Sequence, residues 1–125
     1  MKRLAFLFVA LLLARSAAAQ FPSHPIHILV TIPPGGAPDI VARVVGEKIS
    51  HPLGQPVVID NKPAANGNAA AAETARAAPD GYTLLLAADS LIAINPHVYS
   101  KMPLDTLKDL MPIRLSAAKI GRAHV

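Results

Sequence analysis

Apolar residues follow one another almost without interruption between Ile26 and Ile32, and the run ends at two prolines and two glycines. A half-exposed strand would alternate apolar with polar positions, so a continuous β-branched run is typical of a strand covered on both faces. We therefore expect a strand here, and we expect it to lie centrally in its sheet.

After the glycines, apolar positions recur at helical spacing. They are Ile40, Val41, Val44, Val45 and Ile49, while Arg43, Glu47 and Lys48 fall toward the outside. The pattern predicts a helix that buries the apolar set and ends at His51-Pro52, where Gly54 turns the chain. The strand and this helix form a βα unit.

The following segments repeat the alternation of strand and helix. Residues 57–59 predict a second short strand, residues 68–78 an alanine-rich helix, and residues 83–87 a third strand. Beyond Ile92, prolines interrupt any long element, so only short turns of helix are expected there.

Alternating strands and helices build a parallel sheet with right-handed crossovers and helices on both faces, so the predicted class is α/β. Ligands of such sheets bind at the carboxyl ends of the strands. Three loops leave those ends, at residues 33–39, 61–68 and 88–90, and they are the stretches richest in Gly, Asn, Ser and Asp. We expect the polar chemistry to gather on that edge.

The first loop is the leading candidate for a binding site. Gly35 and Gly36 permit positive φ and the close approach of a ligand, and the N–H groups that open the following helix can hold an anion. A tight strand-to-helix connection needs the same glycines, so both interpretations stand. The spacings of phosphate-binding and dinucleotide-binding loops are absent, and no cofactor is expected.

Asp39 falls in the first turn of the predicted helix, where capping is its structural role because the macrodipole stabilises a carboxylate. Beside a pocket, Asp39 would repel an anion but bind an ammonium or hydroxyl group, and so sort amino or hydroxy acids from plain dicarboxylates. Arg43 either faces solvent or a structural acid, or clamps a carboxylate with its bidentate fork.

In the second loop, Asn66 can adopt left-handed dihedrals nearly as glycine does, and its amide adds a donor and an acceptor. Asp89 and Ser90 follow the third strand, where they complete the site or cap the next turn of helix. The residues expected to bind the ligand are Pro34, Gly35, Gly36, Ala37, Asp39, Asn66, Gly67, Asp89 and Ser90.

Other chemistries lack the residues they need. The five histidines show no metal-ligand spacing and there is no cysteine, so no metal site is expected. No nucleophile elbow and no pair of acids sharing one site indicates catalysis. The formal charge is +4, but without Lys2, Arg3 and Arg15 nine basic residues face eight acidic ones. The basic residues do not cluster, so no nucleic-acid partner is expected.

Those three residues lie in residues 1–19, which have the organisation of a secretory signal peptide. Basic residues open the segment, an apolar core runs from Leu4 to Ala14, and small residues follow up to Ala19. The core is shorter than the roughly 20 residues that span a bilayer. We expect cleavage after Ala19 and a periplasmic location.

Six short blocks stand in a recognisable order. They are residues 21–26, the Pro-Gly-Gly loop with Asp39 and Ala42-Arg43, and residues 53–58, 61–63, 78–85 and 94–96. Together they resemble the substrate-binding receptors of tripartite tricarboxylate transporters, often called Bug receptors. The resemblance implies the first lobe of a type II periplasmic binding protein fold, and a receptor that closes on a small carboxylate and delivers it to membrane permease subunits.

Complete members of that family run more than twice this length, so residues 20–113 are expected to be a partial N-terminal lobe and residues 114–125 a truncated end. Residues 120–125 resemble an in-frame translation of a common sequencing adapter. The second loop has fewer glycines than is usual in the family, which affects its expected binding geometry.

The sequence thus predicts an incomplete periplasmic solute receptor and not an enzyme. One alternative is a small secreted α/β enzyme, in which Asp39 and a histidine would have to act as acid and base. A second alternative is a purely interactive periplasmic domain, whose glycine loop would have no ligand.

Overall fold

The structure is a computed structural model that describes residues 21–114. The predicted signal peptide and residues 115–125 lie outside the described residues. The elements are β1 (Ile26–Val30), α2 (Ala37–Leu53), β2 (Val57–Asn61), the 3-10 turn η2 (Ala64–Gly67), α3 (Asn68–Arg76), β3 (Thr83–Leu86), α4 (Ser90–Ala93) and α5 (Asn95–Val98). Each strand and helix predicted from the sequence is confirmed, with ends that shift by a few residues. None of the helices in residues 21–114 combines the length and apolar character that a membrane crossing requires.

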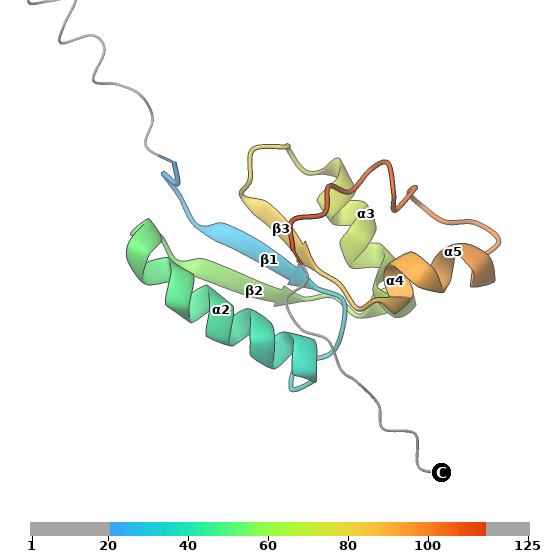
Figure 1. The fold of residues 1–125 in the computed structure, drawn as a ribbon, viewed down its shortest axis with the longest axis horizontal. Coiled ribbons are helices and arrows are strands. Elements are labelled where there is room, and N and C mark those ends of the chain that lie inside the picture. The colour runs from blue at the N-terminus through green and yellow to red at the C-terminus, as the bar shows by residue number, and fades with distance from the viewer. Residues whose placement is uncertain (1–20, 115–125) are drawn as a thin grey trace, which may run out of the picture.

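The three strands form one parallel sheet in the order β2-β1-β3, so the central place predicted for β1 is confirmed. Ile28 lies opposite Ile59 on one side and Leu84 on the other. Both neighbours of β1 run parallel to it, which requires each connection to cross over the sheet. The helices α2 and α3 make these crossovers (Figure 1).

The two helices cover opposite faces of the sheet, because alternate residues of a strand point to opposite sides. On the α2 face, Ile28 and Val30 pack with Ala42, and Leu84 and Leu86 join them. On the α3 face, the core is a separate cluster of Ala71, Ala72, Leu91 and Leu104, with Leu85 packed against it. The predicted α/β class with helices on both faces is confirmed.

The predicted buried face of α2 is wrong in part, although Arg43, Glu47 and Lys48 are exposed as expected. Its buried residues are Asp39, Ala42 and Gly46, whereas Ile40 and Val44 are more than half exposed. Small residues explain the difference, because a Cβ on Gly46 would lie only 3.2 Å from Val57 Cγ1. The helix therefore approaches β2 closely along its small residues, a choice that hydrophobic periodicity alone does not indicate.

The loops at the carboxyl ends of the strands are tied together on one edge, as predicted. Thr31 N–H donates to Leu86 O (3.3 Å), and Thr31 Oγ1 accepts from Ala88 N–H (3.2 Å). The next strand end joins them because Lys62 N–H donates to Val30 O (2.8 Å). The chain after β1 therefore contacts the segments that follow both of its neighbours.

Gly67 and Gly54 offer a matched test of this packing, because both have left-handed φ (+83° and +65°). A Cβ on Gly67 would lie 2.5 Å from Thr31 Cβ, whereas a Cβ on Gly54 would meet nothing within 4 Å. We predict that Gly54→Ala lowers the free energy of unfolding by about 1 kcal/mol, and that Gly67→Ala lowers it by about 2 to 4 kcal/mol. Urea unfolding measures both, and equal losses would contradict the close contact with Thr31.

Candidate ligand-binding edge

The two glycines of the first loop have different backbone conformations. Gly35 has φ +88° and so takes the left-handed conformation expected of it. Gly36 is extended (φ −75°, ψ 162°) and is the N-cap of α2, without a side-chain hydrogen bond to cap the helix. A Cβ there would meet Ile32 Cδ1 at close range, but this atom is the far end of a flexible side chain that can turn away, so the contact does not by itself require glycine. Positive φ therefore explains only the first glycine.

Asp39 is the buried polar centre of this loop, with only 2% of its surface exposed. Its Oδ2 accepts from Gly35 N–H (2.9 Å) and from Arg43 Nε (3.1 Å), and its Oδ1 accepts from Asn61 Nδ2 (2.9 Å). The hydrogen bond from Arg43, followed by those from Gly35 and Asn61, lowers the pKa of Asp39 to about 2. The side chain is therefore ionised at neutral pH and is held by protein donors.

Asn61 and Arg43 complete the network around that carboxylate. Asn61 Nδ2 also donates to Ile32 O (3.1 Å), and its Oδ1 accepts from Arg43 (3.2 Å). Arg43 thus pairs with a structural acid, one of the roles considered for it. Asn61 was missed as a site residue, although its place as a polar residue at the carboxyl end of a strand was the available signal. Direct contact between Asp39 and a ligand stays a prediction, since its described partners are all protein groups.

The start of α2 retains donors that no protein group uses. The first N–H groups of a helix have no partner within it, and the first helical bond here is Ile40 N–H to Gly36 O (3.1 Å). Within residues 21–114, neither Ala37 N–H nor Asp39 N–H has a protein acceptor. Gly35 N–H is occupied by Asp39. Ala37 is exposed, whereas Asp39 is only 2% exposed, so the loop offers one accessible free donor, the Ala37 N–H, beside the exposed Pro34.

The second loop confirms the left-handed conformation predicted for Asn66 (φ 55°, ψ 41°), and Ala65 before it is also left-handed (φ 53°). The Asn66 amide is engaged, because its Nδ2 donates to Asn95 Oδ1 (2.8 Å). Gly67 is buried against Thr31. Sequence reasoning gave neither Asn95 nor Thr31 a role in the site.

At the third loop, Asp89 and Ser90 adopt the capping arrangement that was one of their two expected roles. Asp89 is the N-cap of α4, and its Oδ1 accepts from Ser90 N–H (2.9 Å). This hydrogen bond uses one oxygen of an exposed carboxylate. A contact of either residue with a ligand stays a prediction.

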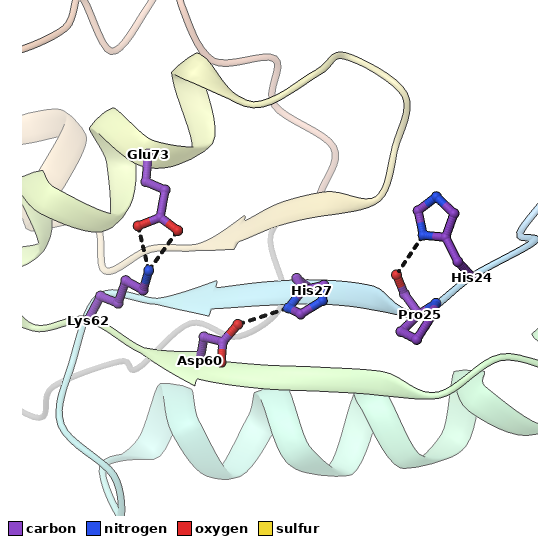
Figure 2. Close-up of polar contacts among 6 residues, drawn as sticks. All are labelled: His24, Pro25, His27, Asp60, Lys62 and Glu73. Carbon is purple, nitrogen blue, oxygen red and sulfur yellow. Dashed lines mark hydrogen bonds and ion pairs between the residues drawn. The ribbon is translucent and has the colours of Figure 1, made fainter.

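The edge is an open surface. Two shallow hollows lie elsewhere, one of about 550 Å³ along α3 and β3 and one of about 490 Å³ beside residues 21–23 and 52–55. Two polar pairs lie near the first of these (Figure 2), where Lys62 binds Glu73 (2.6 Å) and His27 Nδ1 lies 2.9 Å from Asp60. Among residues 21–114, no three potential ligand side chains gather as a metal site would require.

Solved structures with this architecture are periplasmic binding proteins. "Structure of a periplasmic transporter" shares 46% identity with this chain at a TM-score of 0.67, covering 70% of this chain and 30% of that one. A Rhodopseudomonas palustris protein, Rpa4515 with adipate, shares 33% identity at 0.67, covering 70% and 29%. MatC of the same species, with bound malate, shares 42% identity at 0.50, covering 52% and 22%.

Residues 41–121 match the Tripartite tricarboxylate transporter family receptor, and the chain belongs to this family. It is 43% identical over 109 residues to a UPF0065 protein of Bordetella pertussis, covering 84% of this chain and 34% of the relative. It is 38% identical over 111 residues to Protein BugT of the same species, covering 88% and 34%. The chain thus spans about a third of the length of these curated relatives.

These comparisons confirm the resemblance seen in the sequence and the predicted fold. The matching proteins are solute-binding receptors and not enzymes, so the alternative of a small secreted enzyme is set aside.

Asp39 should make stability depend on acid in a defined window. Its pKa falls from 3.8 to about 2 in the folded chain, so the stabilisation is complete above pH 3.8 and is lost as the pH falls toward 2. We predict that Asp39→Asn, which turns an amide toward the donors of Arg43 and Asn61, lowers the melting midpoint at pH 7 by about 5 to 10 °C. It should also flatten the loss of stability between pH 4 and 2.

Thermal unfolding followed by circular dichroism between pH 7 and 2 measures this effect. Glu47→Gln changes an exposed acid on the same helix and is the matched control, with the wild-type midpoint expected. A pH profile of Asp39→Asn that parallels the wild type would contradict the role given to the carboxylate.

Proposed function

We propose that this chain is the first lobe of a periplasmic receptor that captures a small carboxylate for a tripartite tricarboxylate transporter. Membership of the receptor family supports this, as do the adipate and malate named for two similar structures. The carrying observation is the N-terminus of α2, whose free Ala37 N–H lies at the edge where three loops meet.

In this proposal, the exposed Ala37 N–H donates to one carboxylate head of the ligand. Backbone groups of the second loop and ordered waters complete its hydrogen bonds. The helix macrodipole adds partial positive charge at the same place. Arg43 balances the negative charge of Asp39, so the buried acid does not oppose the anion.

A second lobe would close over the other end of the ligand, and the closed receptor would be the form that the membrane permease subunits recognise. Ligand binding then shifts a population between open and closed states. Delivery to the periplasm is assigned to the predicted signal peptide at residues 1–19.

The substitution Ala37→Pro removes the proposed N–H donor of residue 37 without disturbing the helix. Proline is favoured at the first helical position, and Gly36 before it already has the extended ψ of 162° that a following proline requires. We predict that Ala37→Pro weakens malate or adipate binding by about 10- to 100-fold, because a hydrogen bond to a charged group is lost. The melting midpoint should stay within about 2 °C of wild type.

Ala37→Ser is the matched control, because it changes the same exposed side chain and keeps the N–H group. Calorimetry should give it wild-type affinity. If Ala37→Pro bound the carboxylate as tightly as Ala37→Ser, the N-terminus of α2 would not be the binding site.

The remainder of the receptor should be needed for tight binding, because an open edge leaves the ligand in water. Resequencing the locus should reveal an open frame that continues past residue 118. We predict that the continued receptor binds a carboxylate of a panel including malate and adipate with Kd of about 1 μM or tighter. Residues 20–118 alone should bind at least about 100-fold more weakly. Submicromolar binding by residues 20–118, or a stop codon after Val125, would overturn this.

A further inference from the structure

Asn95 makes three hydrogen bonds to Asn66 and Asn68, although no local sequence pattern indicates them. The residue is 1% exposed, and its side chain is among the largest that are fully buried. Its Oδ1 accepts from Asn66 Nδ2 (2.8 Å), while its Nδ2 donates to Asn66 O (3.1 Å) and to Asn68 Oδ1 (2.8 Å). The oxygen of the Asn95 side-chain amide and its nitrogen are therefore both hydrogen-bonded to residues that lie 27 and 29 positions earlier.

The loop that Asn95 holds has an unfavourable backbone. Ala65, Asn66 and Gly67 are consecutive residues in the left-handed region, at φ values of 53°, 55° and 83°. For a residue with a Cβ, that conformation costs roughly 1 to 2 kcal/mol. Such a conformation persists only where surrounding contacts enforce it. Asn95 makes hydrogen bonds to both the backbone carbonyl and the side chain of Asn66, the middle residue of the three.

Asn95 connects the second loop to the chain beyond the third loop. It is the first residue of α5, the second short helix after β3, whereas Asn66 lies in η2 and Asn68 is the first residue of α3. Both segments meet at the end of the sheet to which the strands point (Figure 1). A shift of the third segment would therefore be passed to the second loop through these hydrogen bonds.

We infer that Asn95 is a positioning residue for the carboxylate site: it holds the second loop in its left-handed conformation and so presents that loop's backbone to the ligand. Asn95 is too deeply buried to touch the ligand itself. This inference rests on the proposed function, because it concerns the same edge.

Hydrogen exchange of the 125-residue chain tests the structural half of the inference without any ligand. Asn95→Ala should speed exchange of the amides of residues 64–68 by about tenfold or more, while the amides of β1 keep their wild-type protection. Leu91→Ala is the comparison, since it removes a buried side chain of α4 that packs with Ala71, Ala72 and Leu104. A uniform increase in Asn95→Ala, or the same loop pattern in Leu91→Ala, would overturn the inference.

Glycine substitutions separate a conformational role from simple packing. Ala65→Gly removes the cost of the left-handed backbone, so it should restore slow exchange of the loop when combined with Asn95→Ala. Ala64→Gly is the matched control, because Ala64 lies next to Ala65 in the same exposed turn and does not have positive φ. Equal rescue by both glycines, or rescue by neither, would contradict the inference. If Asn95→Ala does not fold, Asn95→Asp replaces it, since this variant keeps the oxygen that accepts from Asn66 and loses the donors.

Affinity for malate and adipate, measured on the receptor continued to family length, completes the test. Asn95→Ala should raise Kd by about tenfold, because only a fraction of its loops is competent to bind, and Ala65→Gly should reverse the loss. A wild-type receptor that binds neither these nor other small carboxylates would refute the proposed function. A wild-type receptor that binds one of them only as tightly as Asn95→Ala does would refute the role of Asn95 alone.

Discussion

Parallel pairing of β1 with both of its neighbours is the constraint on which the rest of this structure depends. Parallel strands cannot be joined by tight turns, so each connection becomes a helix that crosses one face of the sheet. All three strands consequently point the same way and release their chains at one edge. This topology alone, without any interaction of side chains, brings together the loops at residues 33–39, 61–68 and 88–90.

Polar side chains then lock the three loops to one another. Asn61 ties the end of β2 to Asp39 and the first loop, and Thr31 ties the end of β1 to the segment after β3. Asn95 ties that later segment to the second loop. Each link joins a different pair of loops, so no loop is held by its own sequence neighbours alone. The consequence is an edge whose geometry is fixed before a ligand arrives, which favours binding because less order must be imposed later.

The sequence sufficed for the elements and their topology but not for the packing of α2 or the links between loops. Strands and helices could be predicted because their signals are local: a continuous apolar run, a glycine turn, a helical period. The buried face of α2 could not be predicted in the same way. Ala42 and Gly46 are buried because their small size allows the helix to approach the sheet closely, while Ile40 and Val44 remain exposed. The left-handed Asn66 was predictable from its residue type. Asn61 and Asn95 were not recognised, because their partners lie 18 to 29 positions away along the chain.

The buried carboxylate of Asp39 lies close to the start of α2, where we propose that an anion binds. The negative charges of Asp39 and of the ligand would repel each other at close range. Unit charges about 4 Å apart interact by about 1 kcal/mol in water and by several times more where the solvent is excluded. Arg43 resolves this conflict, since its guanidinium bonds both oxygens of Asp39 and brings a balancing positive charge to the same turn of helix. The partial charge at the start of α2 is then left to act on the ligand. Asp39 therefore shapes the first loop through Gly35, while in the proposed site the electrostatic attraction for a carboxylate would come from the Ala37 N–H, which the acid itself does not use.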